Sequence, residues 1–351
     1  MASPLVRFGP PRLLVGDTGV LMNEVVQGAR RGELTGLLAA LHHDAARLFV
    51  AEHVLVEMER DRSGFAEDRH VDPTLAVRRW HSMYLPYIVV VPVPETWGEG
   101  DDRVTQVANR HPVDLPTARL AVALAPCHGL IQDPDLTDNG FGDPNWLPLT
   151  LASANQAEME LVGTTVRLPT VLAIELAKAT GRTFAKLPQW AQAILLLAGL
   201  AGLYWWEQSG KAHQHVSRVR ELTGKAFDTI IPLAATVFER HTKAQVTWVI
   251  NVIQPAERQA LSEQIARLLA EADEPMTATE MATRMHLSGT PRERGDAIRA
   301  ELRRRDAFIE VSRGRWRLGN PASTADAAIQ PADVRDWLQR AHRYSGQSTG
   351  K

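Results

Sequence analysis

The first 150 positions alternate between short apolar runs and longer amphipathic stretches. The short apolar runs lie at residues 12–16, 48–51, 87–91 and 128–132. Four consecutive β-branched residues, Ile88 to Val91, suit a strand that is buried on both faces of a parallel sheet. The amphipathic stretches predict helices over residues 20–46, around Glu57 and over 117–125. Strands that alternate with helices predict an α/β domain with a mostly parallel sheet flanked by helices over residues 1–150.

From about residue 150 the pattern changes to long alanine- and leucine-rich stretches without strand alternation. The helix candidates there are residues 168–180, 188–207, 211–223, 225–241, 243–253 and 255–272. We interpret residues 151–260 as a helical region. Its segment Trp190 to Trp206 has an apolar centre with aromatic residues at both ends, but the centre is shorter than the ~18 residues that cross a bilayer. We favour a core or dimerisation helix there over a membrane segment.

Residues 261–319 carry the signals of helices followed by a hairpin. Thr277 and Glu280 form a capping box at the start of a helix over 278–285. A turn at residues 288–291 then leads to a second, basic helix over 292–305. Gly314 supplies the tight turn between strand candidates 308–311 and 316–318. This order of elements resembles a winged helix-turn-helix.

The last segment, residues 320–351, reads as a polar linker over 320–330 and a short terminal helix over 331–343. The length of 351 residues agrees with such a division into two or three domains. A single cysteine, Cys127, excludes an intramolecular disulfide and a multi-thiolate metal cluster. The first residues lack the apolar stretch of an export signal. We therefore expect a cytoplasmic protein.

Charge is distributed unevenly along the chain. Residues 1–150 hold 13 arginines, no lysine and 20 acidic residues, whereas residues 284–317 hold ten arginines against five acidic residues. A compact arginine-rich module is typical of nucleic-acid binding. The candidate contacts are Arg292, Arg294, Arg299, Arg303, Arg313, Arg315 and Arg317. A solvated helix face, or a module that packs against protein, is the alternative interpretation.

Four acidic residues stand where predicted strands end or helices begin. Asp17 and Asp133 each follow a strand, and parallel neighbours would bring both to one edge of the sheet. Asp114 lies 19 residues before Asp133, and Glu57 comes from the helix after the second strand. Converging carboxylates favour a hard divalent cation such as Mg²⁺ or Mn²⁺, which can activate water against a phosphodiester. Helix capping, a turn and plain surface exposure are the alternatives for the individual acids.

In the segments around these four acids, the sequence resembles the PIN-domain nuclease family over about residues 10–145. Four segments carry the resemblance: Val15-Gly-Asp-Thr-Gly-Val-Leu21, Val54-Leu-Val-Glu57, Asp114-Leu-Pro-Thr-Ala-Arg-Leu-Ala121 and Leu130-Ile-Gln-Asp-Pro-Asp-Leu136. The resemblance implies a metal-dependent ribonuclease in which Asp17, Glu57, Asp114 and Asp133 hold Mg²⁺ or Mn²⁺, with the Thr18 hydroxyl supporting the first acid, Asp17. Many members of the family are toxins of bacterial toxin–antitoxin pairs.

The chain departs from the family in two respects. Ile131 stands where members usually have serine or threonine two residues before the last aspartate, so Asp135 is an alternative to Asp133 as a metal ligand. Stand-alone toxins are also short, whereas this chain adds some two hundred residues. The expected partners are RNA as substrate and nucleic acid, including DNA, on the basic module. A second copy of the chain and an inhibitory protein stay open as further partners.

Two hypotheses of different classes follow. The first is an endoribonuclease that hydrolyses single-stranded RNA with Mg²⁺ or Mn²⁺. The second is a nucleic-acid-binding regulator or scaffold whose α/β domain is catalytically silent. Two other pairs carry less weight: Cys127 and His128 are adjacent and rarely face each other, and His213 and His215 would lie on different faces of a helix.

Overall fold

The structure is a computed structural model. It describes residues 11–32, 35–42, 44–143, 145, 146, 149 and 252–322, all of which belong to one compact unit of the chain. The helical region expected over residues 151–260 lies outside the described residues up to position 251, including Trp190 to Trp206 and the two histidines His213 and His215. The expected terminal helix also lies outside them. None of the helices among the described residues is long and apolar enough to span a membrane.

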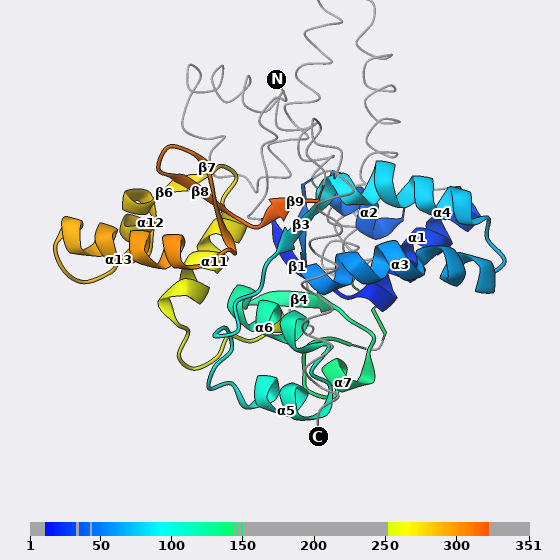
Figure 1. Cartoon of the computed structure of the whole chain (residues 1–351), viewed down its shortest axis with the longest axis horizontal. Coiled ribbons are helices and arrows are strands. Elements are labelled where there is room, and N and C mark those ends of the chain that lie inside the picture. Colours follow the sequence, from blue (N-terminus) through cyan, green and yellow to red (C-terminus); the bar gives the residue numbers. More distant parts are fainter. Residues whose placement is uncertain are drawn as a thin grey trace, which may run out of the picture. The chain divides into compact units, whose positions relative to one another are not determined.

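A six-stranded mixed sheet forms the centre of the described unit (Figure 1). Its strand order is β5-β4-β1-β2-β3-β9. The four inner strands are parallel and comprise β1 (Arg12–Gly16), β2 (Ala46–Ala51), β3 (Ile88–Val91) and β4 (Cys127–Leu130). The two outer strands, β5 (Val252–Ile253) and β9 (Asn320–Pro321), pair antiparallel with β4 and β3. The predicted α/β class and the four predicted inner strands are thus confirmed.

Helices cover both sides of this sheet. On one side, α1, α3 and α4 gather together, and on the other lie α5, α6 and α7 (Figure 1). The helices are α1 (Thr18–Arg31), α2 (Gly36–His42), α3 (Glu52–Asp68), α4 (Pro73–Arg79), α5 (Asp102–Arg110), α6 (Leu115–Leu124) and α7 (Pro134–Thr137), with single turns of π-helix at Trp80–Tyr84 and 3₁₀-helix at Leu85–Tyr87.

The inner strands are apolar on both faces because helices cover both faces. Leu13 and Val15 of β1 belong to the buried cluster that includes α6, whereas Leu14 between them is equally buried toward the opposite side. Successive side chains of a strand point to opposite faces, so such a strand needs apolar residues at every position. The continuous apolar runs in the sequence have this physical origin.

The C-terminal module consists of three helices and a three-stranded antiparallel sheet of order β6-β8-β7. Its elements are α11 (Leu261–Glu271), β6 (Met276–Thr277), α12 (Ala278–Arg284), α13 (Pro291–Arg304), β7 (Phe308–Ser312) and β8 (Arg315–Leu318). The predicted capping box at Thr277 and Glu280 is present. Gly314 turns the hairpin with a φ of 73°. Both predicted helices and the hairpin are therefore confirmed.

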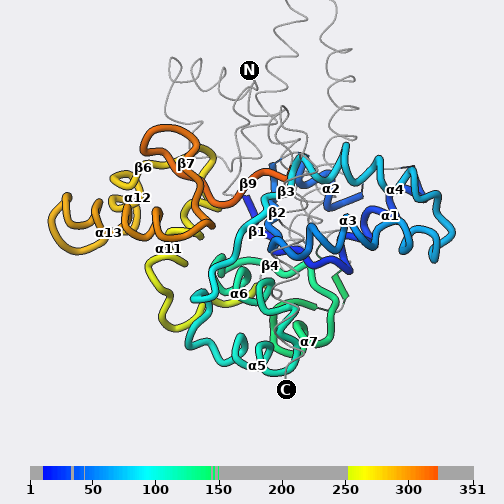
Figure 2. Tube along the Cα trace, in the orientation of Figure 1, coloured from blue at the N-terminus to red at the C-terminus, as the bar shows by residue number. Residues whose placement is uncertain are grey.

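Three expectations at the ends of this module are wrong. Residues 252 and 253, expected at the end of a helix, form β5, and the helix expected over 255–272 begins only at Leu261. Asn320 and Pro321, expected in a linker, form β9, which runs beside β3 (Figure 2). The two short strands β5 and β9 form for the same physical reason. The outer strands of the parallel sheet carry unpaired backbone groups, and short antiparallel strands satisfy them.

The module shares its core with the α/β sheet. One buried cluster runs from Val15 and Phe49 through α6 to Ile265, Ile298 and Trp316. Polar contacts join the same parts: the Trp97 indole N–H donates to the Ser262 hydroxyl over 3.2 Å, and the Gly98 backbone N–H donates to the Glu263 carboxylate over 2.7 Å. The two parts are thus built as one packed body.

Candidate active site

Asp17 ends β1 at the carboxyl edge of the sheet. Its backbone N–H donates to the carbonyl of Leu130 in β4 over 3.1 Å, which fixes Asp17 beside the end of the neighbouring parallel strand. Asp17 occupies the N-cap position of α1, but its side chain makes no capping hydrogen bond. The side chain is 7% exposed. The capping alternative therefore does not account for this buried carboxylate.

Burial changes the acidity of Asp17 strongly. Desolvation, followed by the charges of Asp114, Glu57 and Asp133, raises the pKa of Asp17 to about 7, against a lowering by a hydrogen bond from the backbone of Thr18. All three neighbouring charges come from distant parts of the chain. Asp17 thus lies within the electrostatic field of Glu57, Asp114 and Asp133.

Glu57 faces this group from α3. Its Oε2 accepts a hydrogen bond from the Thr18 hydroxyl over 2.5 Å. Thr18 is the first residue of α1, directly after Asp17. The contact ties the half-buried Glu57 to the same edge of the sheet. The Thr18 hydroxyl, which we expected to support Asp17, thus donates to Glu57 instead.

Asp114 precedes α6 as its N-cap residue, again without a capping hydrogen bond from its side chain. Desolvation, then the charges of Asp133 and Glu57, raise the pKa of Asp114 to about 6, while His111 opposes the shift. Asp114 and Asp17 are therefore both carboxylates whose charged form the fold disfavours.

Asp133 and Asp135 differ in their surroundings. Asp133 follows β4 and accepts a hydrogen bond from the Asp135 backbone N–H over 2.8 Å, so it caps the short helix α7. The Asp135 carboxylate instead pairs with His111 Nε2 over 2.8 Å. The charge of Asp133 acts on both Asp17 and Asp114, whereas that of Asp135 acts on Asp114 and is the smallest cause there. Asp133 thus interacts electrostatically with both Asp17 and Asp114, and more strongly than Asp135 does.

The sheet topology explains why these acids meet. β4 and β1 are parallel neighbours, so the residues that follow them lie at one edge, and α3 and α6 begin at that edge as well. Among the described residues, however, no three His, Cys, Asp or Glu side chains come close enough together to hold one metal ion. The four carboxylates repel one another without converging on a common point.

Several polar residues near the acids were not predicted. His53 lies one helical turn before Glu57 on α3, and its Nε2 is 3.3 Å from the Thr117 hydroxyl, which lies one turn after Asp114 on α6. Burial lowers the pKa of His53 to about 4, and its buried Nδ1 has no hydrogen-bond partner in the part of the chain that the structure describes. The signal in the sequence that could have identified His53 is its spacing of four residues from Glu57, which places both on one face of a helix.

Gln132 fixes the loop that carries Asp133. Its Oε1 accepts hydrogen bonds from Asn23 Nδ2 and from the Trp146 indole N–H, each over 3.2 Å. Cys127, by contrast, is buried in β4, its thiol faces the carbonyl of Ala121, and burial raises its pKa to about 12. A thiol with that pKa is not a nucleophile at neutral pH.

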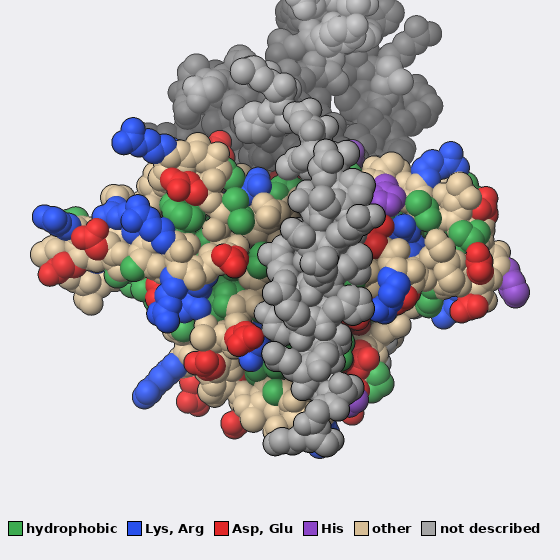
Figure 3. Space-filling view, viewed as in Figure 1, with side chains coloured by type: hydrophobic (Ala, Val, Ile, Leu, Met, Phe, Trp, Pro, Cys, Tyr) green, Lys and Arg blue, Asp and Glu red, His purple; other side chains and the backbone are tan. Residues whose placement is uncertain are grey.

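The arginines of the module fall into two groups. Arg292, Arg303, Arg313 and Arg315 are exposed, and Lys and Arg side chains are visible over this part of the molecule in Figure 3. Arg294 and Arg317 are partly buried and donate to Leu287 and Asn320, while Arg299 pairs with Asp296 over 2.6 Å. The exposed group is the one available to a phosphate backbone.

Comparisons with known proteins give no relative. No protein-family model, no curated protein and no solved structure matches this chain. The functional argument therefore rests on the residues and geometry above.

Proposed function

We propose that this chain is a PIN-type, metal-dependent phosphodiesterase that hydrolyses single-stranded RNA. The observation that carries the proposal is the gathering of Asp17, Glu57, Asp114 and Asp133 at one sheet edge, where burial, with the neighbouring acidic charges adding to it, raises the pKa of Asp17 to about 7 and of Asp114 to about 6. Neither Asp17 nor Asp114 is used as a helix cap. A protein that places like charges together in this way is poised to bind a cation.

The donor chemistry fits Mg²⁺ or Mn²⁺. The four side chains offer carboxylate oxygens, the ligands that hard divalent cations prefer. A cation held by Asp17, Asp114, Asp133 and Glu57 supplies charge neutralisation at the phosphate and activation of a water nucleophile. Since the carboxylates do not converge on one point in the structure, binding requires side-chain rotations that draw them together.

The residues around the acids have positioning roles in this proposal. The Thr18 hydroxyl donates to Glu57 and helps to orient its carboxylate. His111 holds Asp135 and, by its charge, favours the ionised form of Asp114. Gln132 anchors the loop before Asp133 to α1 through Asn23. Together these contacts restrict the acids to the edge at which a phosphate would enter.

The test is cleavage of labelled single-stranded RNA and single-stranded DNA by the full chain with Mg²⁺, Mn²⁺ or EDTA. We expect metal-dependent cutting of RNA that is lost in Asp17→Asn and Asp114→Asn. Glu67→Gln, which changes an exposed acid at the far end of α3, is the matched control and should cut normally. Equal cutting by wild type and Asp17→Asn contradicts the proposal.

A second candidate is a nucleic-acid-binding regulator with a winged helix-turn-helix-like module and a silent α/β domain. The exposed arginines Arg292, Arg303, Arg313 and Arg315 favour it. Affinity for duplex DNA that falls steeply with added salt, together with no cleavage in either metal, would establish this alternative. Loss of that affinity in Arg292→Ala and Arg313→Ala would locate the binding surface on the module.

A further inference from the structure

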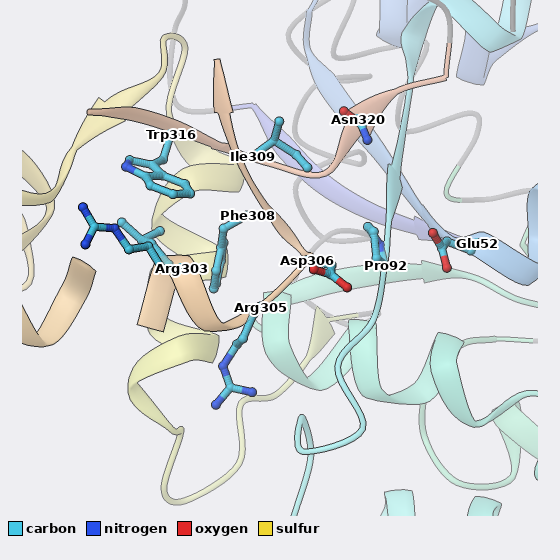
Figure 4. A pocket seen from close by; sticks show the side chains of 10 residues that line it. Glu52, Pro92, Arg303, Arg305, Asp306, Phe308, Ile309, Trp316 and Asn320 are labelled. Carbon is cyan, nitrogen blue, oxygen red and sulfur yellow. The ribbon is translucent and has the colours of Figure 1, made fainter. Parts of the chain in front are cut away.

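A cavity of about 390 Å³ lies between the α/β sheet and the C-terminal module (Figure 4). Glu52 and Pro92 line it from the α/β side, and Arg303, Asp306, Phe308 and Trp316 line it from the module. Its volume falls at the lower end of the range of roughly 300–1,000 Å³ found for small-molecule sites. The cavity thus has room for one nucleoside-sized group.

The cavity lies at the same edge of the sheet as the four acids. Glu52 directly follows β2, and Pro92 directly follows β3, just as Asp17 follows β1. Neighbouring strands are about 4.8 Å apart, so β3 lies on the order of 10 Å from β1. A few nucleotides cover that span at about 3.4 Å or more each. One strand of RNA can therefore reach from the acids to the cavity.

The module wall includes two aromatic side chains, Phe308 and Trp316, that the core holds in place. Phe308 and Trp316 are at most 8% exposed, and both belong to the buried cluster shared with the sheet. With so little of either ring exposed, this wall gives a base apolar contact rather than an open ring face for stacking. Since these rings are already fixed by packing, binding orders few additional side chains.

Two polar groups of the cavity, on Arg303 and Asp306, are available to a ligand. Arg303 and Asp306 are both exposed, and neither has a hydrogen bond or ion pair with any of the described residues. Arg305, in contrast, is held by Glu301 and by the Thr96 hydroxyl, and its guanidinium points away from Asp306 in Figure 4. The cavity therefore presents one uncommitted guanidinium, that of Arg303, and one uncommitted carboxylate, that of Asp306, beside an apolar wall.

We propose that this cavity binds a base of single-stranded RNA a few nucleotides from the cleaved phosphate and prefers guanine; the inference rests on the proposed ribonuclease function. An ionised carboxylate only accepts hydrogen bonds. Guanine presents two adjacent N–H donors on its pairing edge, whereas uracil presents one donor between two acceptors. Asp306 pairs with the guanine edge, and Arg303 binds a backbone phosphate at the mouth.

Equilibrium binding in EDTA tests the cavity independently of cleavage. The probes are a labelled uridine heptamer and the same heptamer with one central guanosine, each titrated with the full chain. We expect the guanosine oligomer to bind wild type about tenfold more tightly, and Asp306→Asn to remove that difference. Arg303→Ala should weaken both oligomers several-fold. Its neighbour Arg304→Ala, equally exposed but outside the cavity, should leave both affinities unchanged.

Three outcomes would overturn the inference. These are equal binding of the two oligomers by wild type, discrimination that persists in Asp306→Asn, and GMP that binds as tightly as the oligomer. The last outcome would assign the cavity to a free nucleotide. Cleavage in Mg²⁺ without base preference would leave the proposed nuclease standing while the cavity site fails. Base discrimination without any cleavage would retain the cavity and overturn the nuclease.

Discussion

At the scale of single residues, Asp17 is the group whose surroundings bear most directly on function. It is almost fully buried, next to three further carboxylates, and without a cation among the described side chains to pair with. A buried charge of this kind costs folding free energy unless a ligand neutralises it. Asp17 thus links the stability of the fold to the occupancy of the proposed site.

The first prediction concerns the pH dependence of stability. The pKa of Asp17 rises from 3.8 in the unfolded chain to about 7 in the fold, so the folded state favours the protonated form. The stabilisation of the folded state by protonated Asp17 is complete below about pH 4 and is lost as the pH rises through 7. Between these two limits, the contribution of Asp17 to the free energy of unfolding changes by about 4 kcal/mol. Asp17→Asn should therefore be more stable than wild type at pH 8 in EDTA, with the gap closing toward pH 5.

Thermal unfolding of both proteins between pH 5 and 8 measures this gap. Glu67→Gln serves as the control and should follow the wild-type curve. Adding Mn²⁺ should raise the wild-type melting temperature at pH 8 and leave Asp17→Asn nearly unchanged. A gap that is the same at pH 5 and pH 8 would show that Asp17 is not the titrating group.

The second prediction concerns the Thr18 hydroxyl. Thr18→Val keeps the shape of the side chain but removes the donor to Glu57. We expect a stability loss of only about 1 kcal/mol, because water can reach the half-buried carboxylate. The loss in kcat/KM for RNA should be larger, from about tenfold to a hundredfold, since Glu57 loses its fixed orientation. Thr18→Ser should restore most of the activity; an inactive Thr18→Ser would argue against the hydroxyl as the cause.

At the scale of elements, the edge strand β9 depends on a glycine. Gly319 has a φ of 60°, and a Cβ at this position would lie 2.5 Å from the Val90 carbonyl oxygen in β3. Gly314 in the hairpin turn has a similar φ of 73°, but a Cβ there meets nothing within 4 Å. The two glycines share a backbone conformation and differ in their neighbours.

The third prediction uses this pair. Gly314→Ala should cost about 1 kcal/mol, the penalty of the left-handed conformation alone. Gly319→Ala should cost about 3 kcal/mol or more, because the backbone of β9 must also move away from β3. Urea unfolding of both variants provides the comparison. Equal losses would mean that β9 does not pack against β3 as tightly as described.

At the scale of the whole molecule, the module and the α/β sheet are joined by buried polar contacts as well as by a common core. Glu263 at the start of α11 is 3% exposed. One of its oxygens accepts from the Gly98 backbone N–H and the other from the Ala260 backbone N–H, both over 2.7 Å. On the sheet side, Arg47 donates to the carbonyl of Ala270 over 2.9 Å. These contacts make the module part of the same folding unit.

The fourth prediction follows from these contacts. Glu263→Ala leaves two backbone N–H groups without an acceptor and should cost about 2–5 kcal/mol. Hydrogen exchange should then rise together in α11 and in α6, which packs against it. Glu271→Ala changes an exposed ion pair of the same helix and should have little effect. Faster exchange confined to α11 would show that the module opens independently of the sheet.

The sequence by itself determined the features that arise from neighbouring residues. The apolar runs predicted the four inner strands, and Thr277 with Glu280 predicted a helix start. Gly314 predicted a hairpin. Each of these signals acts within a few residues, through strand periodicity, side-chain capping or a backbone conformation that glycine adopts easily. The order of strands and helices also predicted that Asp17 and Asp133 follow strands.

Only the tertiary structure decided what depends on residues far apart in the chain. The strands β5 and β9 are two residues long and carry no periodicity, so they form only because the edges of the sheet need partners. The contact of Gly98 with Glu263 spans 165 residues. The raised pKa of Asp17, the contact of His53 with Thr117 and the cavity beside Asp306 likewise exist only after distant segments meet. Burial and electrostatic coupling are properties of the packed molecule, and no local pattern encodes them.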